Sequence, residues 1–247
     1  MTAPIVPFEQ YFKGKKFIVT GANAGIGECI TNRLVNMGAH VFAVGRDPKK
    51  LPPASSNLTP VVADVGKWDA YDTIKALGPV HGLVNNAGVA FIESFFEMTQ
   101  EGWDTTLNVN ARGVARVSQA VAKNMIEAGI KGSIVNVSST ISERAIPDHT
   151  SYCASKGAVN QVTRTMCVEL GPHGIRSNSV NPTVVMTKMG IKAWSDPAKS
   201  NPILSRIPLG RFAECDDVAN VMLFLLSDYS TYVNGVSIPV DGGFLSG

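Results

Sequence analysis

The sequence has no marked excess of charge of either sign. Its 247 residues include 22 Lys and Arg against 20 Asp and Glu, which leaves a formal net charge of +2. Proteins that bind nucleic acid or an anionic membrane surface usually carry a strong excess of basic residues. A short basic cluster at 13–16 leads directly into a predicted strand and is interpreted as its solvated start. Nucleic acid is therefore not expected as a partner.

Paired cysteines and long apolar runs are also missing. The four cysteines, at positions 29, 153, 167 and 215, include no C-x-x-C pair, so the usual spacing of a zinc site is absent and no metal is expected. Scattered thiols in a chain of this size favour a reducing compartment. The first ten residues lack a basic start with an apolar stretch, and the longest strongly apolar run, 221–226, is too short for a membrane span. We expect a cytoplasmic protein without a membrane-spanning segment.

Segments with strand and helix character alternate along most of the chain. With 45% apolar and 17% charged residues, the chain can fill a sizeable core. Strands are predicted at 16–20, 40–44, 60–63, 80–84, 134–137, 175–180 and 235–240, and helices at 25–37, 68–77, 100–128, 152–170 and 216–226. This alternation predicts right-handed βαβ crossovers and a mostly parallel sheet with helices on both faces. Without a repeat or a linker, residues 1–247 are expected to form one α/β domain, a Rossmann-type doubly wound sheet.

The regular alternation lapses after Pro182. Residues 183–212 are rich in Pro, Lys and Met and include Trp194. A long irregular insertion beside the end of a strand is often a lid or a substrate-binding loop. This segment is therefore predicted to be a substrate loop.

A glycine-rich turn joins the first predicted strand to the first predicted helix. Residues 20–27 have the spacing G-x-x-x-G-x-G, which differs from the common G-x-G-x-x-G dinucleotide fingerprint. Glycines permit a tight turn, and the start of the helix offers free N–H groups and a positive dipole end to a pyrophosphate. The position of the turn in a βαβ unit favours dinucleotide binding over a plain strand-to-helix connection. The turn residues expected to contact the cofactor are Gly21, Asn23, Gly25, Ile26 and Gly27.

The residues after the second predicted strand indicate which dinucleotide binds. An acidic residue there grips the 2′-hydroxyl of the adenosine ribose, whereas an arginine accommodates a 2′-phosphate. Arg46 follows the strand directly, so NADP(H) is favoured. Asp47 comes next and keeps NAD(H) open as an alternative, and Arg46 could also be a solvated loop residue.

A tyrosine and a lysine four positions apart form the candidate catalytic pair. If 152–170 is helical, Tyr152 and Lys156 rise from one face, one turn apart. An ammonium beside a phenol favours the phenolate, so the lysine is expected to lower the tyrosine pKa from its usual value of about 10. Tyr152 could then exchange a proton with a carbonyl or alcohol oxygen, which the hydroxyl of Ser139 could hold. Taken alone, the pair is also compatible with an ordinary helix surface.

Together these motifs resemble the short-chain dehydrogenase/reductase family over essentially the whole chain. The matching positions are Thr20, Gly21, Gly25, Gly27, Asp64, Val65, Asn86, Ala87, Gly88, Asn110, Ser139, Tyr152, Lys156 and 240–243. The resemblance implies that Asp64 and Val65 contact the adenine, and that the cofactor site continues along Asn86, Ala87 and Gly88.

The resemblance also implies roles near the nicotinamide. It implies that Tyr152 and Lys156 both contact the cofactor, with Lys156 bonding the nicotinamide ribose, and that Asn110 binds a water molecule linking Lys156 to bulk solvent. By itself, Asn110 would be taken for a surface or helix-bending asparagine. Thr187 and the backbone of Val185 resemble the residues that contact the nicotinamide end of the cofactor.

Within the family, the stretches at 136–139, 181–187 and 194–197 are most similar to NADPH-dependent reductases of sugars and α-dicarbonyl compounds. This similarity implies a small ketone substrate and a homotetramer, to which the apolar helix at 218–226 could contribute. His149 and Trp194 are candidates for shaping a sugar-sized pocket with Ser139 and Tyr152, although both could be packing anchors.

Three points stay open. Those reductases tend to carry a lysine near the 2′-phosphate, where this chain has Asn23 and Ala24, so the preference for NADP(H) would depend more on Arg46. The same machinery also serves reductases of 3-oxoacyl thioesters and steroids. A dinucleotide-binding protein without turnover is a further alternative.

Overall fold

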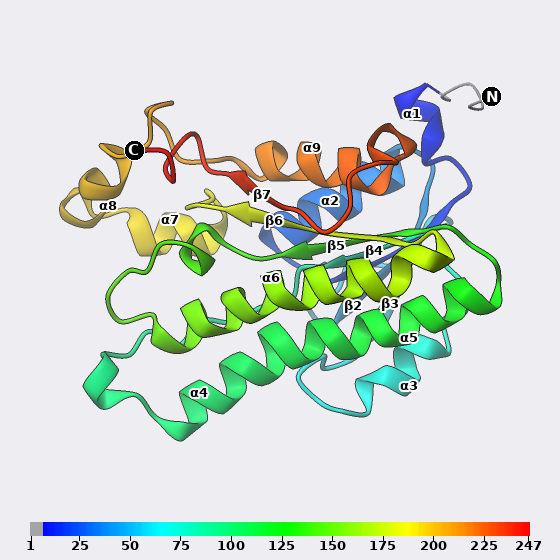
Figure 1. The fold of residues 1–247 in the computed structure, drawn as a ribbon, viewed down its shortest axis with the longest axis horizontal. Coiled ribbons are helices and arrows are strands. Elements are labelled where there is room, and N and C mark those ends of the chain that lie inside the picture. The colour runs from blue at the N-terminus through cyan, green and yellow to red at the C-terminus, as the bar shows by residue number, and fades with distance from the viewer. Residues whose placement is uncertain (1–6) are drawn as a thin grey trace.

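One seven-stranded sheet runs through the centre of the structure (Figure 1). This computed structural model describes residues 7–247, apart from the side chains of Met189 and Ala193. The first six residues, which belong to the segment where no leader is predicted, lie outside the described residues. In spatial order the strands are β3 (Leu58–Val62), β2 (His40–Gly45), β1 (Lys16–Thr20), β4 (Gly82–Asn85), β5 (Ser133–Val137), β6 (Arg176–Pro182) and β7 (Ser237–Val240).

All six pairings between neighbouring strands are parallel, which confirms the predicted doubly wound sheet. Ile18 in β1, for example, is in register with Phe42 of β2 and with Leu83 of β4. A parallel sheet needs helical crossovers on both faces, so its central strands are apolar along their whole length. Every residue of β4 and β5 is buried accordingly.

Helices cover both faces of the sheet. One face carries α2 (Gly25–Asn36) and α9 (Cys215–Leu226), and the other carries α3 (Ala70–Lys75), α4 (Gln100–Leu107), α5 (Gly113–Glu127) and α6 (Thr150–Leu170) (Figure 1). The core is accordingly divided into two main clusters, one around Ile30, Leu34 and Met222, and one around Val121 and Met125. The remaining helices are α1 (Phe8–Tyr11), α7 (Lys188–Trp194), α8 (Pro197–Leu204) and the short η1 (Phe95–Glu97), η3 (Thr140–Ser142), η4 (Gly171–His173) and η5 (Asp228–Ser230).

Three expectations about the helices need correction. The predicted helix at 100–128 is interrupted by a π-helical turn, η2 (Asn108–Arg112). The segment at 183–212, expected to be irregular, contains α7 and α8, with the side chains of Thr187 and Asp196 capping their first turns. In the apolar helix at 218–226, six residues are buried against the sheet and α2 and so pack in the subunit's own core, while Phe224, with an exposed fraction of 37%, is left on the outer side of the helix.

The strand order reverses at β1, whose neighbours β2 and β4 continue the chain in opposite directions across the sheet. In open α/β sheets, ligands bind at this switch point, outside the carboxyl ends of the strands. The fold thus places the glycine-rich turn after β1 at the position where a ligand is expected. No helix among residues 7–247 combines the length and the apolar character that crossing a membrane requires.

Candidate functional site

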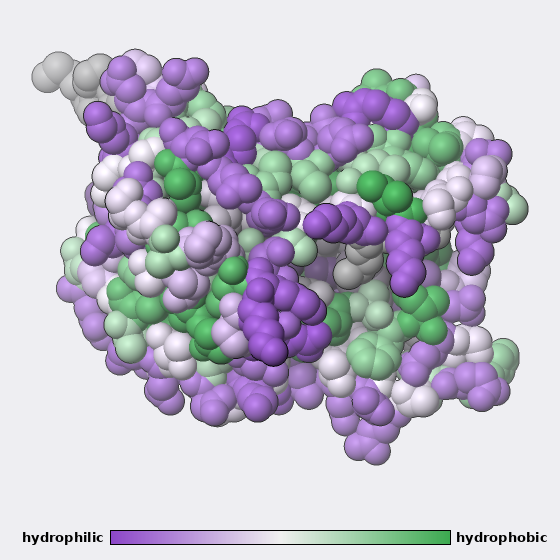
Figure 2. Space-filling model, turned by 180° about the vertical axis from the view of Figure 1, so that it is seen from behind, coloured by the Kyte–Doolittle hydropathy of each residue, from purple (hydrophilic) through white to green (hydrophobic). Residues whose placement is uncertain are grey.

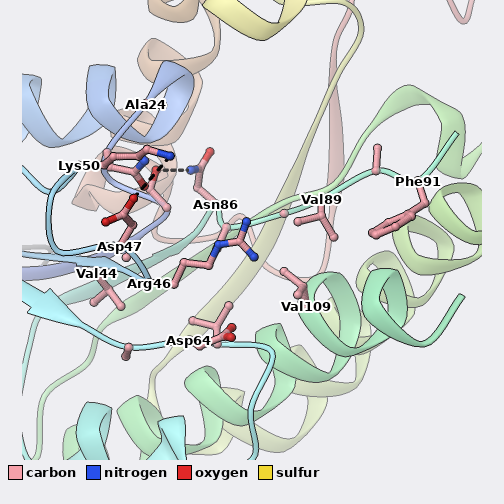
Figure 3. A pocket seen from close by; sticks show the side chains of 18 residues that line it. Ala24, Val44, Arg46, Asp47, Lys50, Asp64, Asn86, Val89, Phe91 and Val109 are labelled. Carbon is pink, nitrogen blue, oxygen red and sulfur yellow. Dashed lines mark hydrogen bonds and ion pairs between the residues drawn. The ribbon is translucent and has the colours of Figure 1, made fainter. Parts of the chain in front are cut away.

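A cavity of about 600 Å³ lies beyond the carboxyl ends of β1 to β4 (Figure 3). We call it the large cavity. Side chains from the ends of β2 and β3 and from the segment after β4 surround it, and Phe91 lies at the end away from Lys50 (Figure 3). Most of the residues predicted to bind a cofactor line it: Gly21, Asn23, Arg46, Asp64, Val65, Asn86, Ala87 and Gly88.

The glycine turn has the geometry that the phosphates of a dinucleotide require. Gly21 and Gly25 have φ angles of 64° and 54°, in the left-handed region that favours glycine. A side chain at either position would also clash, because a Cβ at Gly21 would lie 2.9 Å from Ala87 Cα and one at Gly25 would lie 2.8 Å from Thr187 Cγ2. Helix α2 begins without a side-chain cap, so its first N–H groups are available to an anion.

Thr20, at the end of β1, holds this turn against the end of β4. Its Oγ1 accepts hydrogen bonds from the backbone N–H groups of Asn86 (3.0 Å) and Ala87 (3.1 Å). In return, the Asn86 side-chain amide donates to the carbonyls of Thr20 and Gly21, each at 3.1 Å. Asn86 therefore braces the turn as well as lining the cavity. Thr20 belongs to the recognised motif, but its bracing role was missed because it depends on a contact 66 residues away.

The other predicted cofactor residues lie near the large cavity without lining it. Ile26 faces the core, and Gly27 packs against the carbonyl of Gly21. Thr187 contacts Gly25 through its methyl group and caps α7 by accepting a hydrogen bond from Gly190 N at 3.0 Å. Val185 is buried and pairs with Ala213. The segment containing 185 and 187 follows β6 and packs in the same core cluster as α2, which brings it to the glycine turn.

A smaller cavity, of about 170 Å³, lies beside the carboxyl end of β5. We call it the small cavity. All four residues predicted to contact a substrate line it: Ser139, His149, Tyr152 and Trp194. The rings of His149 and Tyr152 are 6.5 Å apart, and His149 Nδ1 is 2.6 Å from the Pro147 carbonyl. The expected grouping of these residues around one pocket is thus present.

Apolar side chains that the sequence analysis missed complete the small cavity, namely Ile141, Ile146, Val184, Ile203 and Phe244. Phe244 comes from the C-terminal segment and packs with Ile207 and Phe212. Arg144 holds this segment by donating to the Phe244 carbonyl at 3.2 Å, with its guanidinium 5.2 Å from the ring centre. A single phenylalanine near the C-terminus gives no signal of such a role in the sequence.

Tyr152 and Lys156 connect the two cavities. Lys156 is buried, lies with its Nζ 5.4 Å from the Tyr152 ring centre, and donates to the Val137 carbonyl at 2.8 Å. A Cβ built on Gly88, which lines the large cavity, would be 3.7 Å from Lys156 Nζ. The ammonium therefore lies behind the wall of the large cavity, and the phenol faces the small one.

Burial changes the pKa of both residues in a way that corrects the sequence-based expectation. Loss of solvent raises the pKa of Tyr152 to about 12, and the neighbouring Cys153 adds to this rise. Burial also lowers the pKa of Lys156 to about 8. The lysine does not lower the tyrosine pKa, because its ammonium bonds the Val137 carbonyl and both groups pay the cost of desolvation. Tyr152 therefore holds its proton at neutral pH, as a proton donor must.

Asn110 lies inside the π-helical turn and is completely buried. Its Oδ1 accepts from the Val89 N–H and its Nδ2 donates to the Val89 carbonyl, both at 2.8 Å, and Nδ2 also reaches Ser155 Oγ at 3.0 Å. The surface interpretation of this asparagine is therefore wrong. Its side chain ties the segment after β4 to α6, which carries Tyr152 and Lys156.

The residues 7–247 contain no group of three or more His, Cys, Asp and Glu side chains that could hold a metal ion. The described features are instead a phosphate-sized glycine turn at a switch point, and a buried tyrosine–lysine pair beside a small pocket. This fold and site define a dinucleotide-dependent oxidoreductase of the Rossmann type.

Known proteins support this class. The family described as "Enoyl-(Acyl carrier protein) reductase" matches residues 21–245. L-xylulose reductase from Homo sapiens is 48% identical over 240 residues, 96% of this chain and 98% of its own length. D-erythrulose reductase from Gallus gallus is 48% identical over 238 residues, 95% and 97% of the two chains. A crystal structure of a gluconate 5-dehydrogenase from Burkholderia cenocepacia, in complex with NADP and tartrate, superposes with a TM-score of 0.88 at 32% identity, covering 97% and 99%.

The chain belongs to the short-chain dehydrogenase/reductase family and is an oxidoreductase of that family.

Proposed function

We propose that this protein is an NADPH-dependent carbonyl reductase that converts L-xylulose to xylitol and also reduces α-dicarbonyl compounds. The observation that carries the proposal is the small cavity, which is lined by a tyrosine with its proton retained, a serine and a histidine. Relatives with 48% identity over nearly the whole chain are named as reductases of L-xylulose and D-erythrulose, both small ketoses.

The large cavity supports NADPH as the cofactor. The open backbone of the glycine turn and the uncapped start of α2 suit a pyrophosphate, and Arg46 lies where a 2′-phosphate is expected. In this proposal Asp64 and Val65 would contact the adenine of the cofactor. Thr187 and the backbone of Val185 would contact its nicotinamide end.

NADPH supplies, when bound, the hydride that adds to the ketone carbon. Tyr152 donates its phenolic proton to the ketone oxygen, which leaves a secondary alcohol. Ser139 donates a hydrogen bond to the same oxygen while negative charge develops on it. Lys156 would hold the cofactor through a hydrogen bond to the nicotinamide ribose. Because the Asn110 side chain is engaged with Val89 and Ser155, we assign the binding of the relay water to its backbone carbonyl.

The size and lining of the small cavity favour short substrates over steroids and long acyl thioesters. Its volume of about 170 Å³ is below the range of about 300–1,000 Å³ that is usual for pockets of drug-sized ligands, which favours a small ketone. His149, Ser139 and Thr183 supply polar contacts for hydroxyl groups, while Trp194 and Phe244 form apolar walls. The apolar walls also suit the methyl groups of a dicarbonyl such as diacetyl.

Initial-rate measurements test this proposal directly. L-xylulose, D-erythrulose and diacetyl are each offered with NADPH and with NADH, beside a steroid ketone and a 3-oxoacyl thioester. We expect turnover of the three small ketones with NADPH as the better cofactor. Oxidation of NADPH only by the thioester or the steroid would replace the proposed substrate class, and cofactor binding without turnover of any carbonyl would favour a non-catalytic protein.

We further propose that the protein is a cytoplasmic homotetramer. Support for assembly comes from exposed apolar side chains, notably Phe95 and Phe96 with exposed fractions of 66% and 91%, and Val168 on α6 with 74%. On the face seen in Figure 2, hydrophobic residues form several small patches among hydrophilic ones. Light scattering after size-exclusion chromatography should give four times the mass of one chain. Fractionation of cells that express the protein tests its location, and the protein should appear in the cytoplasmic fraction.

A further inference from the structure

The charged side chains that follow β2 include a carboxylate as well as an arginine, so by themselves they do not form a simple phosphate-binding site. Arg46 lines the large cavity and has no hydrogen bond or ion pair to another residue within 7–247. Asp47, which follows directly, also lines the cavity. Arg46 and Asp47 together carry no net charge, and the glycine turn contributes only Gly21, Asn23 and Ala24 to the lining.

Lys50 supplies the missing cation. Its Nζ lies 3.5 Å from Asp47 Oδ2, and it too lines the cavity (Figure 3). The other carboxylate oxygen accepts the Lys49 N–H at 3.0 Å, and the Lys50 N–H donates to the Asp47 carbonyl at 3.1 Å. These bonds hold the Asp47 carboxylate in a tight turn, with the Lys50 ammonium on its free oxygen.

This arrangement bears on the choice between two cofactors. A free carboxylate after the second strand accepts a hydrogen bond from the ribose 2′-hydroxyl of NADH and repels the 2′-phosphate of NADPH. We propose that Lys50 neutralises Asp47, and that Lys50 is thereby a specificity-determining residue that leaves Arg46 free to hold the 2′-phosphate. The inference rests on the proposed function, since it concerns the cofactor of the same reaction.

Binding measurements without a carbonyl substrate test the inference independently of turnover. Calorimetry on the full chain gives the dissociation constants of NADPH and NADH for Lys50→Gln and for the matched control Lys49→Gln. Lys49 is exposed in the same turn but does not line the large cavity. We expect Lys50→Gln to weaken NADPH binding by roughly two- to fivefold, which corresponds to one exposed charge contact, and to leave NADH binding unchanged or tighter. Lys49→Gln should match the wild type.

Adding Asp47→Asn to the Lys50→Gln variant distinguishes neutralisation from a direct contact between Lys50 and the phosphate. If Lys50 acts by cancelling the carboxylate, the double variant regains the wild-type affinity for NADPH. A double variant that binds NADPH as weakly as Lys50→Gln overturns the inference. So does a Lys50→Gln variant that cannot be distinguished from Lys49→Gln.

Failure of this inference is separable from failure of the proposed function. A wild-type protein that binds neither cofactor contradicts the proposed function, and the Lys50 inference with it. A wild-type protein that prefers NADPH, with Lys50→Gln unchanged from the Lys49→Gln control, contradicts only the role of Lys50.

Discussion

Replacing Tyr152 with Phe removes a single hydroxyl from the wall of the small cavity. Within residues 7–247 that hydroxyl makes no side-chain hydrogen bond, while the ring keeps its contact with His149 and its position over Lys156. No protein contact is lost, so the free energy of unfolding should change by less than about 1 kcal/mol. Tyr152 also does not line the large cavity, so the affinity for NADPH should stay within about threefold of the wild type.

The effect on catalysis should be far larger. Because burial raises the pKa of Tyr152 to about 12, almost every molecule carries the phenolic proton at neutral pH, and the variant loses the whole contribution of the acid. General acid catalysis contributes about 10²–10⁴-fold. A loss of at least about 100-fold in kcat, equivalent to roughly 2.7 kcal/mol in the activation barrier, is therefore expected.

The assay follows the loss of NADPH absorbance with L-xylulose at neutral pH, with urea unfolding and NADPH calorimetry on the same samples. Tyr232→Phe is the matched control, since its side chain is fully exposed and lines neither cavity. It should keep the wild-type kcat. A Tyr152→Phe variant that retains more than about a tenth of the wild-type kcat, with stability and NADPH binding intact, would refute the assignment of Tyr152 as the acid.

Three further variants test other parts of the site. Ser139→Ala should lower kcat about 100-fold, whereas Ser205→Ala should not, since Ser205 is an exposed residue directly after α8. Equal rates for the two variants would exclude Ser139 as a donor to the developing oxyanion. Lys156 has a native pKa of about 8 against its usual 10.5, so the unfolded state binds more protons than the native state between these two pH values. The stability of the wild type relative to Lys156→Met should therefore rise from pH 8 towards 10.5, by up to about 3 kcal/mol. A flat or falling difference in urea unfolding would contradict this burial effect. Thr20→Val leaves two backbone N–H groups without their acceptor and should cost about 1–3 kcal/mol of stability, and a variant as stable as the wild type would show that the brace is not needed.

Local patterns predicted most of the elements and the candidate residues. Short apolar runs bounded by Gly and Pro marked the strands, and β1 was predicted with its observed bounds of 16–20. The predicted bounds of the other strands contain small errors. These errors arise because the ends of a strand depend on pairing with neighbouring strands. The long helix at 100–128 was predicted unbroken, because nothing in its residues announces the π turn that buries Asn110 against Val89 and Ser155.

Contacts distant in sequence account for what was missed. Thr20 forms hydrogen bonds with residues 66 and 67 positions away. Ser139 reaches the small cavity at the end of β5, whereas Phe244 comes to the same cavity from the C-terminal segment. Lys50 is close in sequence to Arg46, yet only the turn at 47–50 brings its ammonium to Asp47 and to the large cavity. Pairwise spacing in one sequence carries no record of such contacts.

The sequence by itself determined which chemical groups are available and their order: a glycine turn after a buried strand, an arginine after the next one, and a tyrosine and a lysine one helical turn apart. Only the tertiary structure decided how those groups behave. Tyr152 has a raised pKa and Lys156 a lowered one because segments from elsewhere in the chain exclude water from both. Desolvation depends on everything that packs around a group, whereas sequence spacing specifies only its nearest neighbours.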